Sequence, residues 1–174
     1  MEWTTVAQVN QAIDEYGKSL QKLKNFQNDA NNFLPKGAIT VGTIGEYYCY
    51  IWLKHQFPSC KVHYGDSTQK SWDIEVISNE GQSTKYQCKT VSLNSTNLTI
   101  SNLKKGFDKL IIIVLSEDYF PEVAYELTND FEFRDISSFA IKDPRKPNSG
   151  SPKLKSVTKE INFEFFDSLA DRLC

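Results

Sequence analysis

The chain has few cysteines, and they follow no pattern that would bind zinc or build a disulfide framework. Its 174 residues include four cysteines, with no CxxC pair and no regular spacing, so neither a zinc ribbon nor a cystine-stapled scaffold is indicated. Two of them lie inside apolar runs, where a buried thiol acts as a small hydrophobic residue. We therefore expect reduced, structural cysteines, as in a cytoplasmic protein.

Long apolar runs are also absent. No stretch approaches the ~20 apolar residues that a membrane-spanning helix needs. The N-terminal sequence "MEWTTVAQVNQAIDEYGKSL" lacks the basic head and apolar block of a signal peptide. We expect an intracellular protein with no part in a membrane.

Neither sign of charge dominates the composition. Charged residues make up 24 % of the chain and the formal net charge is -2 at pH 7, so no overall basic field attracts a polyanion. Any nucleic-acid binding must come from a local patch or from metal ions. A nucleophile elbow, a phosphate-binding glycine loop and a helix-turn-helix reader are missing as well.

An N-terminal helix is predicted over residues 5–32, because apolar residues recur there at three- and four-residue spacing. Thr4 or Thr5 would cap its start, and Pro35 and Gly37 would end it. The apolar positions are Val6, Val9, Ile13, Tyr16, Leu20, Leu23 and Phe26.

The next segment predicts a second helix that is largely buried. It begins at Thr40 or Thr43, ends before Pro58 and carries one acid, Glu46, in its first turns. Its apolar face is expected to consist of Ile44, Tyr47, Tyr48, Ile51 and Trp52.

After this helix the apolar period changes from 3.6 to 2, which predicts strands. The all-apolar run 110–115 predicts a central strand buried on both faces, and the sequence "NEGQ" predicts a hairpin turn. We expect short helices opening at Ser101 and over 162–173. The predicted strands are 61–64, 72–77, 84–91, 109–116, 121–128 and a short one within 131–141.

These elements predict an α/β fold in which helices flank a mixed β-sheet. We expect a single domain with an added N-terminal helix, since 174 residues suffice for one core. Residues 1–36 form that helix, for packing or dimerisation, and residues 37–174 form the α/β domain. The segment 142–156 is rich in Pro, Gly, Ser and Lys and predicts a loop.

Polar side chains gather on the hairpin "SWDIEVISNEGQSTKYQCKTVS". Residues i and i+2 of a strand share a face, so Gln87 and Lys89 point the same way. A register that buries Ile74 and Val76 brings Asp73 close to both. Three polar groups are thus expected at one place.

Such a group suits metal-assisted hydrolysis of a phosphodiester. Mg²⁺ or Mn²⁺ prefers oxygen ligands, which the Asp73 carboxylate and the Gln87 amide can supply. Lys89 can orient or help deprotonate the attacking water and offset charge in the transition state. Glu46 can add a further ligand if its helix packs across this end of the sheet.

The stretches "GTIGEYYCYIWL", "WDIEV" and "YQCKTVS" resemble the PD-(D/E)XK nuclease superfamily, with its restriction-endonuclease-like fold, in the variant that has Gln before the lysine. The resemblance covers residues 42–115. It implies Glu46 as the helix acid, Asp73 as the central metal ligand, Gln87 as the third ligand and Lys89 as the catalytic lysine. Trp72 stands where the family name has Pro, and Gln87 removes one negative charge from the metal site.

The resemblance implies a Mg²⁺-dependent DNA endonuclease, of the kind found in restriction or defence. Cutting both strands of a duplex would require two active sites and hence a homodimer. An alternative is a catalytically weak nuclease-fold protein that serves as a nucleic-acid-binding or protein-interaction subunit. A third possibility is an enzyme that resolves branched DNA.

Each candidate residue also has a plainer interpretation. Glu46 suits the positive end of a helix dipole. Asp73 and Glu75 can both be solvated residues of an edge strand, and Glu75 is the alternative functional acid. Lys89 can be an edge-strand lysine that discourages aggregation.

Lysines outside the motif are candidates for phosphate contacts, or else serve only solubility. Lys146, Lys153 and Lys155 lie in the predicted loop. The remaining members of the predicted contact set are Lys104 and Lys105.

Overall fold

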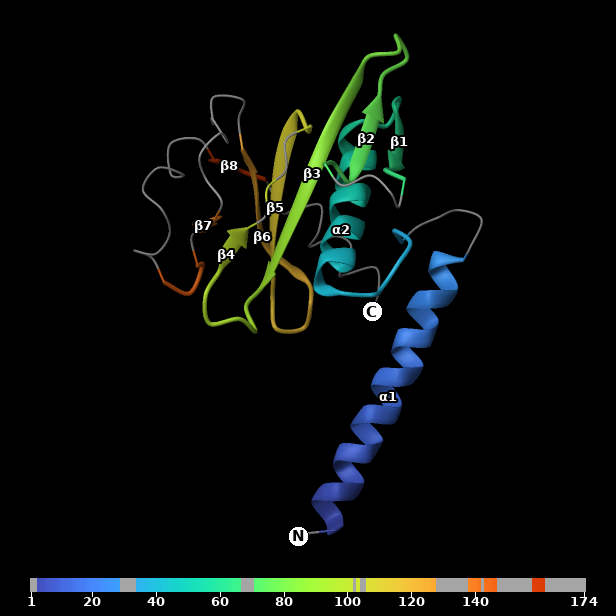
Figure 1. Ribbon diagram of the computed structural model, residues 1–174, viewed down its shortest axis with the longest axis vertical. Coiled ribbons are helices and arrows are strands. Elements are labelled where there is room, and N and C mark those ends of the chain that lie inside the picture. The colour runs from blue at the N-terminus through green and yellow to red at the C-terminus, as the bar shows by residue number, and fades with distance from the viewer. Residues whose placement is uncertain are drawn as a thin grey trace.

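The computed structural model describes residues 3–28, 34–66, 71–101, 103, 106–127, 138–141, 143–146 and 158–161. It has an α/β fold in which a six-stranded mixed sheet carries one helix on one face, and a second, long helix extends away from the sheet (Figure 1). In this part of the chain neither helix is both long and apolar enough to cross a membrane. The elements are α1 (Trp3–Gln27), α2 (Val41–Gln56), β1 (Lys61–Tyr64), β2 (Ile74–Ile77), β3 (Ser83–Ser92), β4 (Thr99–Ser101), β5 (Lys109–Leu115), β6 (Pro121–Leu127), β7 (Ser138–Ala140) and β8 (Thr158–Glu160).

The main sheet has the strand order β1-β2-β3-β5-β6-β8. β3 and β5 are parallel and every other neighbouring pair in this sheet is antiparallel. β4 and β7 form a separate two-stranded sheet. The predicted α/β class, with a mixed sheet and helices, is confirmed, and β3 lies in the interior of the sheet.

The apolar run of β5 forms the centre of the sheet and is buried on both faces, as predicted. Ile111, Ile113 and Leu115 point into the core under α2. Leu110 and Ile112 enter the core on the opposite face. Each such side chain contributes about 1.5–3 kcal/mol when fully buried, so β5 anchors both cores at once.

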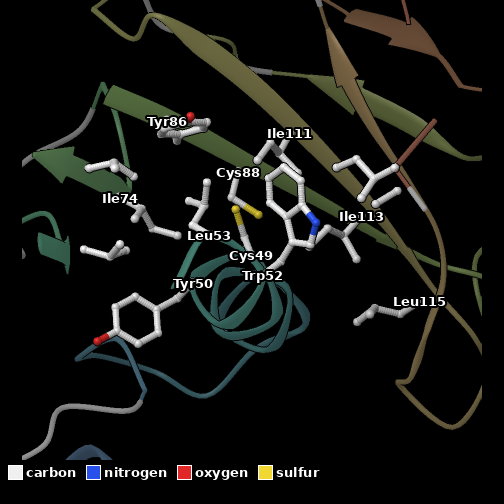
Figure 2. Close-up of a cluster of buried hydrophobic side chains, with 14 residues drawn as sticks. Cys49, Tyr50, Trp52, Leu53, Ile74, Tyr86, Cys88, Ile111, Ile113 and Leu115 are labelled. Carbon is white, nitrogen blue, oxygen red and sulfur yellow. The ribbon is translucent and has the colours of Figure 1, made fainter. Parts of the chain in front are cut away.

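Helix α2 begins at a capping box. Thr40 is the N-cap, its side chain accepts a hydrogen bond from the Thr43 backbone N–H at 3.3 Å, and the Thr43 side chain bonds back to Thr40. The face that meets the sheet agrees with the predicted one at Trp52, and it also carries Cys49 and Leu53, which were not predicted (Figure 2). Of the predicted apolar face, Ile44, Tyr47, Tyr48 and Ile51 are only partly buried.

The predicted face was only partly right because the helix approaches the sheet most closely through its smallest residues. Gly45 and Cys49 are buried against β3, and their size lets the backbone of α2 come close to the strand. Ile44, Tyr48 and Ile51 pack against the same core but stay partly exposed.

Two predicted termini also differ in the structure. Thr4 and Thr5 lie inside α1 rather than at its N-cap. Ser101 does not start a helix, because it ends β4 and pairs with Ser138 of β7. The buried side chains of Ile100 and Phe139 join this small sheet to the core beside β5, which explains why the segment is extended.

Other predictions are confirmed or lie beyond the described residues. The "NEGQ" turn forms, with Ser78 N–H donating to the Gln82 carbonyl at 2.9 Å and Gly81 at a φ of 81°. β8 was not predicted. The predicted helix 162–173, residues 128–137 and most of the predicted loop 142–156 lie outside the described residues.

Candidate functional site

The β2–β3 hairpin has the register that the apolar pattern predicts. Ile74 pairs with Tyr86 and both are buried under α2. Asp73 directly precedes β2, and its backbone N–H donates to the Tyr86 carbonyl at 2.8 Å. Asp73 consequently stands opposite Gln87.

Two hydrogen bonds orient the Asp73 carboxylate. Gln87 Nε2 donates to Asp73 Oδ2, and the Cys88 backbone N–H donates to the same oxygen at 2.8 Å. Gln87 is 4 % exposed, so its amide is held in one place. Because its nitrogen faces Asp73, its carbonyl oxygen is the atom that suits a cation.

Glu46 reaches this group because α2 crosses β3 at very close range. A Cβ added to Gly45 would lie 1.8 Å from Thr90 Oγ1, so only glycine permits this approach. The next residue of the helix is Glu46, half-buried. The sheet and the helix thereby place their acids at one site.

The electrostatics show that Glu46, Asp73 and Lys89 act on one another. Burial, and next the charge of Asp73, raise the pKa of Glu46 to about 7, and Lys89 opposes the rise. Burial also raises the pKa of Asp73, whereas the hydrogen bond from the Cys88 N–H, the charge of Lys89 and the hydrogen bond from Gln87 lower it. Two half-buried acids thus share a site with one ammonium group.

This donor set fits a divalent cation. The negative charge of Asp73 makes Glu46 harder to ionise, so a positive charge near both carboxylates would be favourable. Over the described residues, no group of three or more His, Cys, Asp or Glu could hold a metal. The Gln87 carbonyl could add an oxygen to the two carboxylates, and a set of oxygen ligands would suit Mg²⁺ or Mn²⁺ better than a softer metal.

The structure bears on two alternatives, the edge-strand role of Lys89 and the functional role of Glu75. Lys89 lies on β3, between β2 and β5, so it is no edge-strand lysine. Glu75 accepts a hydrogen bond from Ser83 Oγ and lies 3.1 Å from His63 Nε2. It is thus engaged within the hairpin rather than with Gln87.

The predicted phosphate-contacting lysines fall mostly outside the described residues. Lys104, Lys105, Lys153 and Lys155 lie there, and their contacts stay a prediction. Lys146 is described, with its Nζ 3.8 Å from Asp143 Oδ2 and its side chain 64 % exposed.

The turn that bears Lys146 is fastened by its neighbour Arg145. The Arg145 guanidinium donates to Asp143 at 3.0 Å and to the Leu93 carbonyl at 2.7 Å, and this hydrogen bonding lowers the pKa of Asp143. Arg145 therefore attaches residues 143–146 to the end of β3, a structural role.

Two contributors to the site were missed in the sequence. The Cys88 backbone N–H orients Asp73, and a backbone group leaves no side-chain signal. Gly45 did leave one, because a glycine inside a helix costs about 1 kcal/mol relative to alanine. The position of Gly45 directly before Glu46 indicates that the helix comes close to a neighbouring element at the candidate site.

Glu46→Gln should stabilise the metal-free protein above pH 7. The pKa of Glu46 is about 7 in the folded protein, against an ordinary value of 4.5 that we take for the unfolded chain. Between these two pH values the folded state binds a proton that the unfolded state has released, so the free energy of unfolding falls as the pH rises. The variant avoids this loss, which is about 3 kcal/mol at most at ~1.4 kcal/mol per pKa unit. Urea unfolding in EDTA from pH 4 to 8 measures it.

Glu80→Gln, in the exposed hairpin turn, is the control for that experiment. Its stability should follow the parent at every pH. Equal stability of Glu46→Gln and parent at pH 8 would show that Glu46 is not buried as described.

Comparisons with known proteins were made at the level of sequence and of structure. No protein-family model and no curated protein matches the chain significantly. Among solved structures, a bacterial homing endonuclease, I-Ssp6803I, matches with a TM-score of 0.43 and 18 % sequence identity, over 66 % of this chain and 81 % of that chain. At this TM-score, the activity of the present chain has to be inferred from its own residues.

Proposed function

We propose that the chain is a Mg²⁺-dependent endonuclease that hydrolyses phosphodiester bonds of DNA, as in the PD-(D/E)XK superfamily. The observation that carries the proposal is the hydrogen-bonded pair of Asp73 and Gln87, with the charges of Glu46 and Lys89 acting at the same place. Residues 37–174 are the catalytic domain in this proposal.

Each residue has a distinct role. Asp73 and Gln87 would hold the cation through a carboxylate and a carbonyl oxygen, and Glu46 would add its carboxylate once ionised. The bound cation supplies positive charge against the phosphate and lowers the pKa of water. The Lys89 ammonium donates hydrogen bonds to the scissile phosphate and to the attacking water, and so stabilises charge that develops in the transition state.

The surroundings of the site agree with a charged substrate. Asp73 and Glu46 are half-buried, which strengthens their interactions with a cation relative to those of exposed carboxylates. Lys146, with Lys104, Lys105, Lys153 and Lys155, is proposed to contact phosphates beyond the scissile one. A role in restriction or defence, acting as a homodimer on duplex DNA, is part of the proposal.

Lys89→Ala tests the proposal. We expect Mg²⁺-dependent nicking of supercoiled plasmid by the parent, abolished by EDTA, and a loss of about 100-fold or more in the variant. Lys85→Ala is the matched control, because Lys85 lies on the same strand with its Nζ 5.7 Å from the Trp72 ring centre. Equal nicking by Lys89→Ala and Lys85→Ala would remove Lys89 from the chemistry.

A second function, DNA binding without cleavage, is favoured by one observation. The site has two carboxylates rather than three, since Gln87 stands in the place of an acid. Two results together would favour this binding role. The parent protein would retard DNA in a gel but leave plasmid intact, and the Gln87→Glu variant would cleave the plasmid.

A further inference from the structure

Helix α1 presents an apolar face that no described element covers. The helix extends away from the sheet (Figure 1), and three residues near its middle are more than half exposed. Val9 is 53 % exposed, Ile13 62 % and Tyr16 67 %. A row of exposed large apolar residues on a long helix marks an interaction surface.

The spacing of this row is that of a coiled-coil seam. Val6, Ile13 and Leu20 are seven residues apart, and so are Val9, Tyr16 and Leu23. The two sets alternate at steps of three and four, which makes them positions a and d of three heptads. A repeat of 3.5 residues keeps a narrow stripe facing one neighbouring helix, whereas packing on a sheet of its own domain favours a wider face.

The opposite side of α1 is satisfied within the helix. Asp14 and Lys18 form an ion pair at 2.7 Å, and Gln11 Nε2 donates to Glu15 at 2.9 Å. These residues lie at heptad positions b, c and f, away from the seam. The exposed large apolar side chains of α1 therefore lie in the seam and, beside its end, at Phe26.

The residues that flank the seam favour an identical partner. Positions e and g beside the seam hold small or polar residues except for Phe26, which is 54 % exposed, and Lys24 is their one charged residue in the described helix. Partners of a different kind are ordinarily selected by opposite charges at e and g, which α1 lacks. In a parallel pair Lys24 would face Ser19 of the other copy, so no like charges meet. The other flanking residues are Asn10, Ala12 and Gly17.

We propose that α1 forms a parallel, two-stranded coiled coil with α1 of a second copy of this chain. β-Branched Val6 and Ile13 at position a favour two strands. The 25-residue helix is about 37 Å long, of which the seam from Val6 to Leu23 spans about 26 Å. The proposal does not depend on the nuclease activity.

A parallel pair places both α/β domains at the same end of the coiled coil. The end of α1 is attached to its own domain, because Gln27 Nε2 donates to the carbonyls of Pro35 and, at 3.2 Å, of Gly37. The two candidate sites would thus stand near each other, where both could reach one ligand. An antiparallel pair would separate the domains by roughly the helix length.

The oligomeric state of the full chain tests the proposal. Light scattering after size exclusion should give twice the chain mass for the parent and once that mass for Ile13→Asp with Tyr16→Asp, because charges in the seam lose solvation. Gln11→Asp, on the opposite side of the same helix, should stay dimeric. A monomeric parent, or a dimer unchanged in the double variant, overturns the proposal.

Two further measurements test whether the double variant still folds and whether the two helices run parallel. The thermal unfolding of the α/β domain should survive in the double variant, since the seam lies outside both cores. Leu20→Cys should cross-link with itself under mild oxidation in a parallel pair, where Leu20 meets its own copy. If Leu20→Cys cross-linked no more than the parent chain does, the parallel arrangement would be overturned.

Discussion

Replacing Asp73 by asparagine is expected to lower DNA cleavage by about 1,000-fold, which corresponds to about 4 kcal/mol of activation free energy. Asp73 is the acid on which the site converges, since both Gln87 and the Cys88 backbone N–H donate to its Oδ2. Asparagine keeps an oxygen of similar shape for these donors but removes the negative charge that a divalent cation requires. Plasmid cleavage over a range of Mg²⁺ concentrations measures the effect.

Glu75→Gln is the matched control for this prediction. Glu75 lies two residues away on the same hairpin, yet it pairs with His63 and Ser83, so its loss should leave cleavage near the parent rate. Circular dichroism should show both variants folded. If Asp73→Asn cut like the parent while Glu75→Gln did not, the functional acid would be Glu75.

Gly45→Ala is expected to destabilise the domain by about 3 kcal/mol, as overpacking in a tight core does, and to reduce cleavage with it. The added Cβ would lie 1.8 Å from Thr90 Oγ1 and under 3 Å from two carbons of the same side chain. These contacts force α2 away from β3. Since Glu46 follows Gly45 directly, the same shift separates Glu46 from Asp73.

Gly42→Ala separates this effect from helix propensity. Gly42 lies in the first turn of α2, where a Cβ would meet only Thr40 Oγ1 at 3.4 Å, so alanine there should be neutral or slightly stabilising. Urea unfolding of both variants measures the difference. Gly45→Ala as stable as Gly42→Ala would show that α2 does not approach β3 so closely.

A second substitution can relieve the clash. Thr90→Ala removes the two nearest atoms and leaves its own Cβ at 2.7 Å, so it should restore part of the stability lost in Gly45→Ala. A double-mutant cycle with a coupling energy of at least about 1 kcal/mol would identify the contact. Additive effects would contradict it.

Local patterns in the chain predicted much of the α/β domain. The alternation of β2 and β3 around "NEGQ" was enough to place Asp73 by Gln87, because side chains of a strand have a period of two and one face had to be buried. The all-apolar run of β5 predicted a central strand for a similar reason. Thr40 was one of two expected caps of α2, and the structure selects it.

Contacts between distant segments could not be predicted in this way. The pairing of β4 with β7 joins Ser101 to Ser138 across a long stretch of chain, and a short polar segment beside a glycine reads equally well as a helix start. The sheet-facing side of α2 was predicted only in part for a related reason: hydrophobicity pointed correctly to Trp52, but it gave no sign that Gly45 and Cys49 would also be buried there.

The amino-acid sequence alone was enough to specify which residue types could form a metal site and on which faces of the hairpin they lie, because strand periodicity is local. Only the tertiary structure decided that Glu46 joins Asp73 and that its pKa rises to about 7, because burial and the field of a distant charge exist only after α2 has packed on β3. The seam of α1 depends on both. The heptad spacing can be recognised in the sequence, but only the fold shows that no described part of the chain covers the seam.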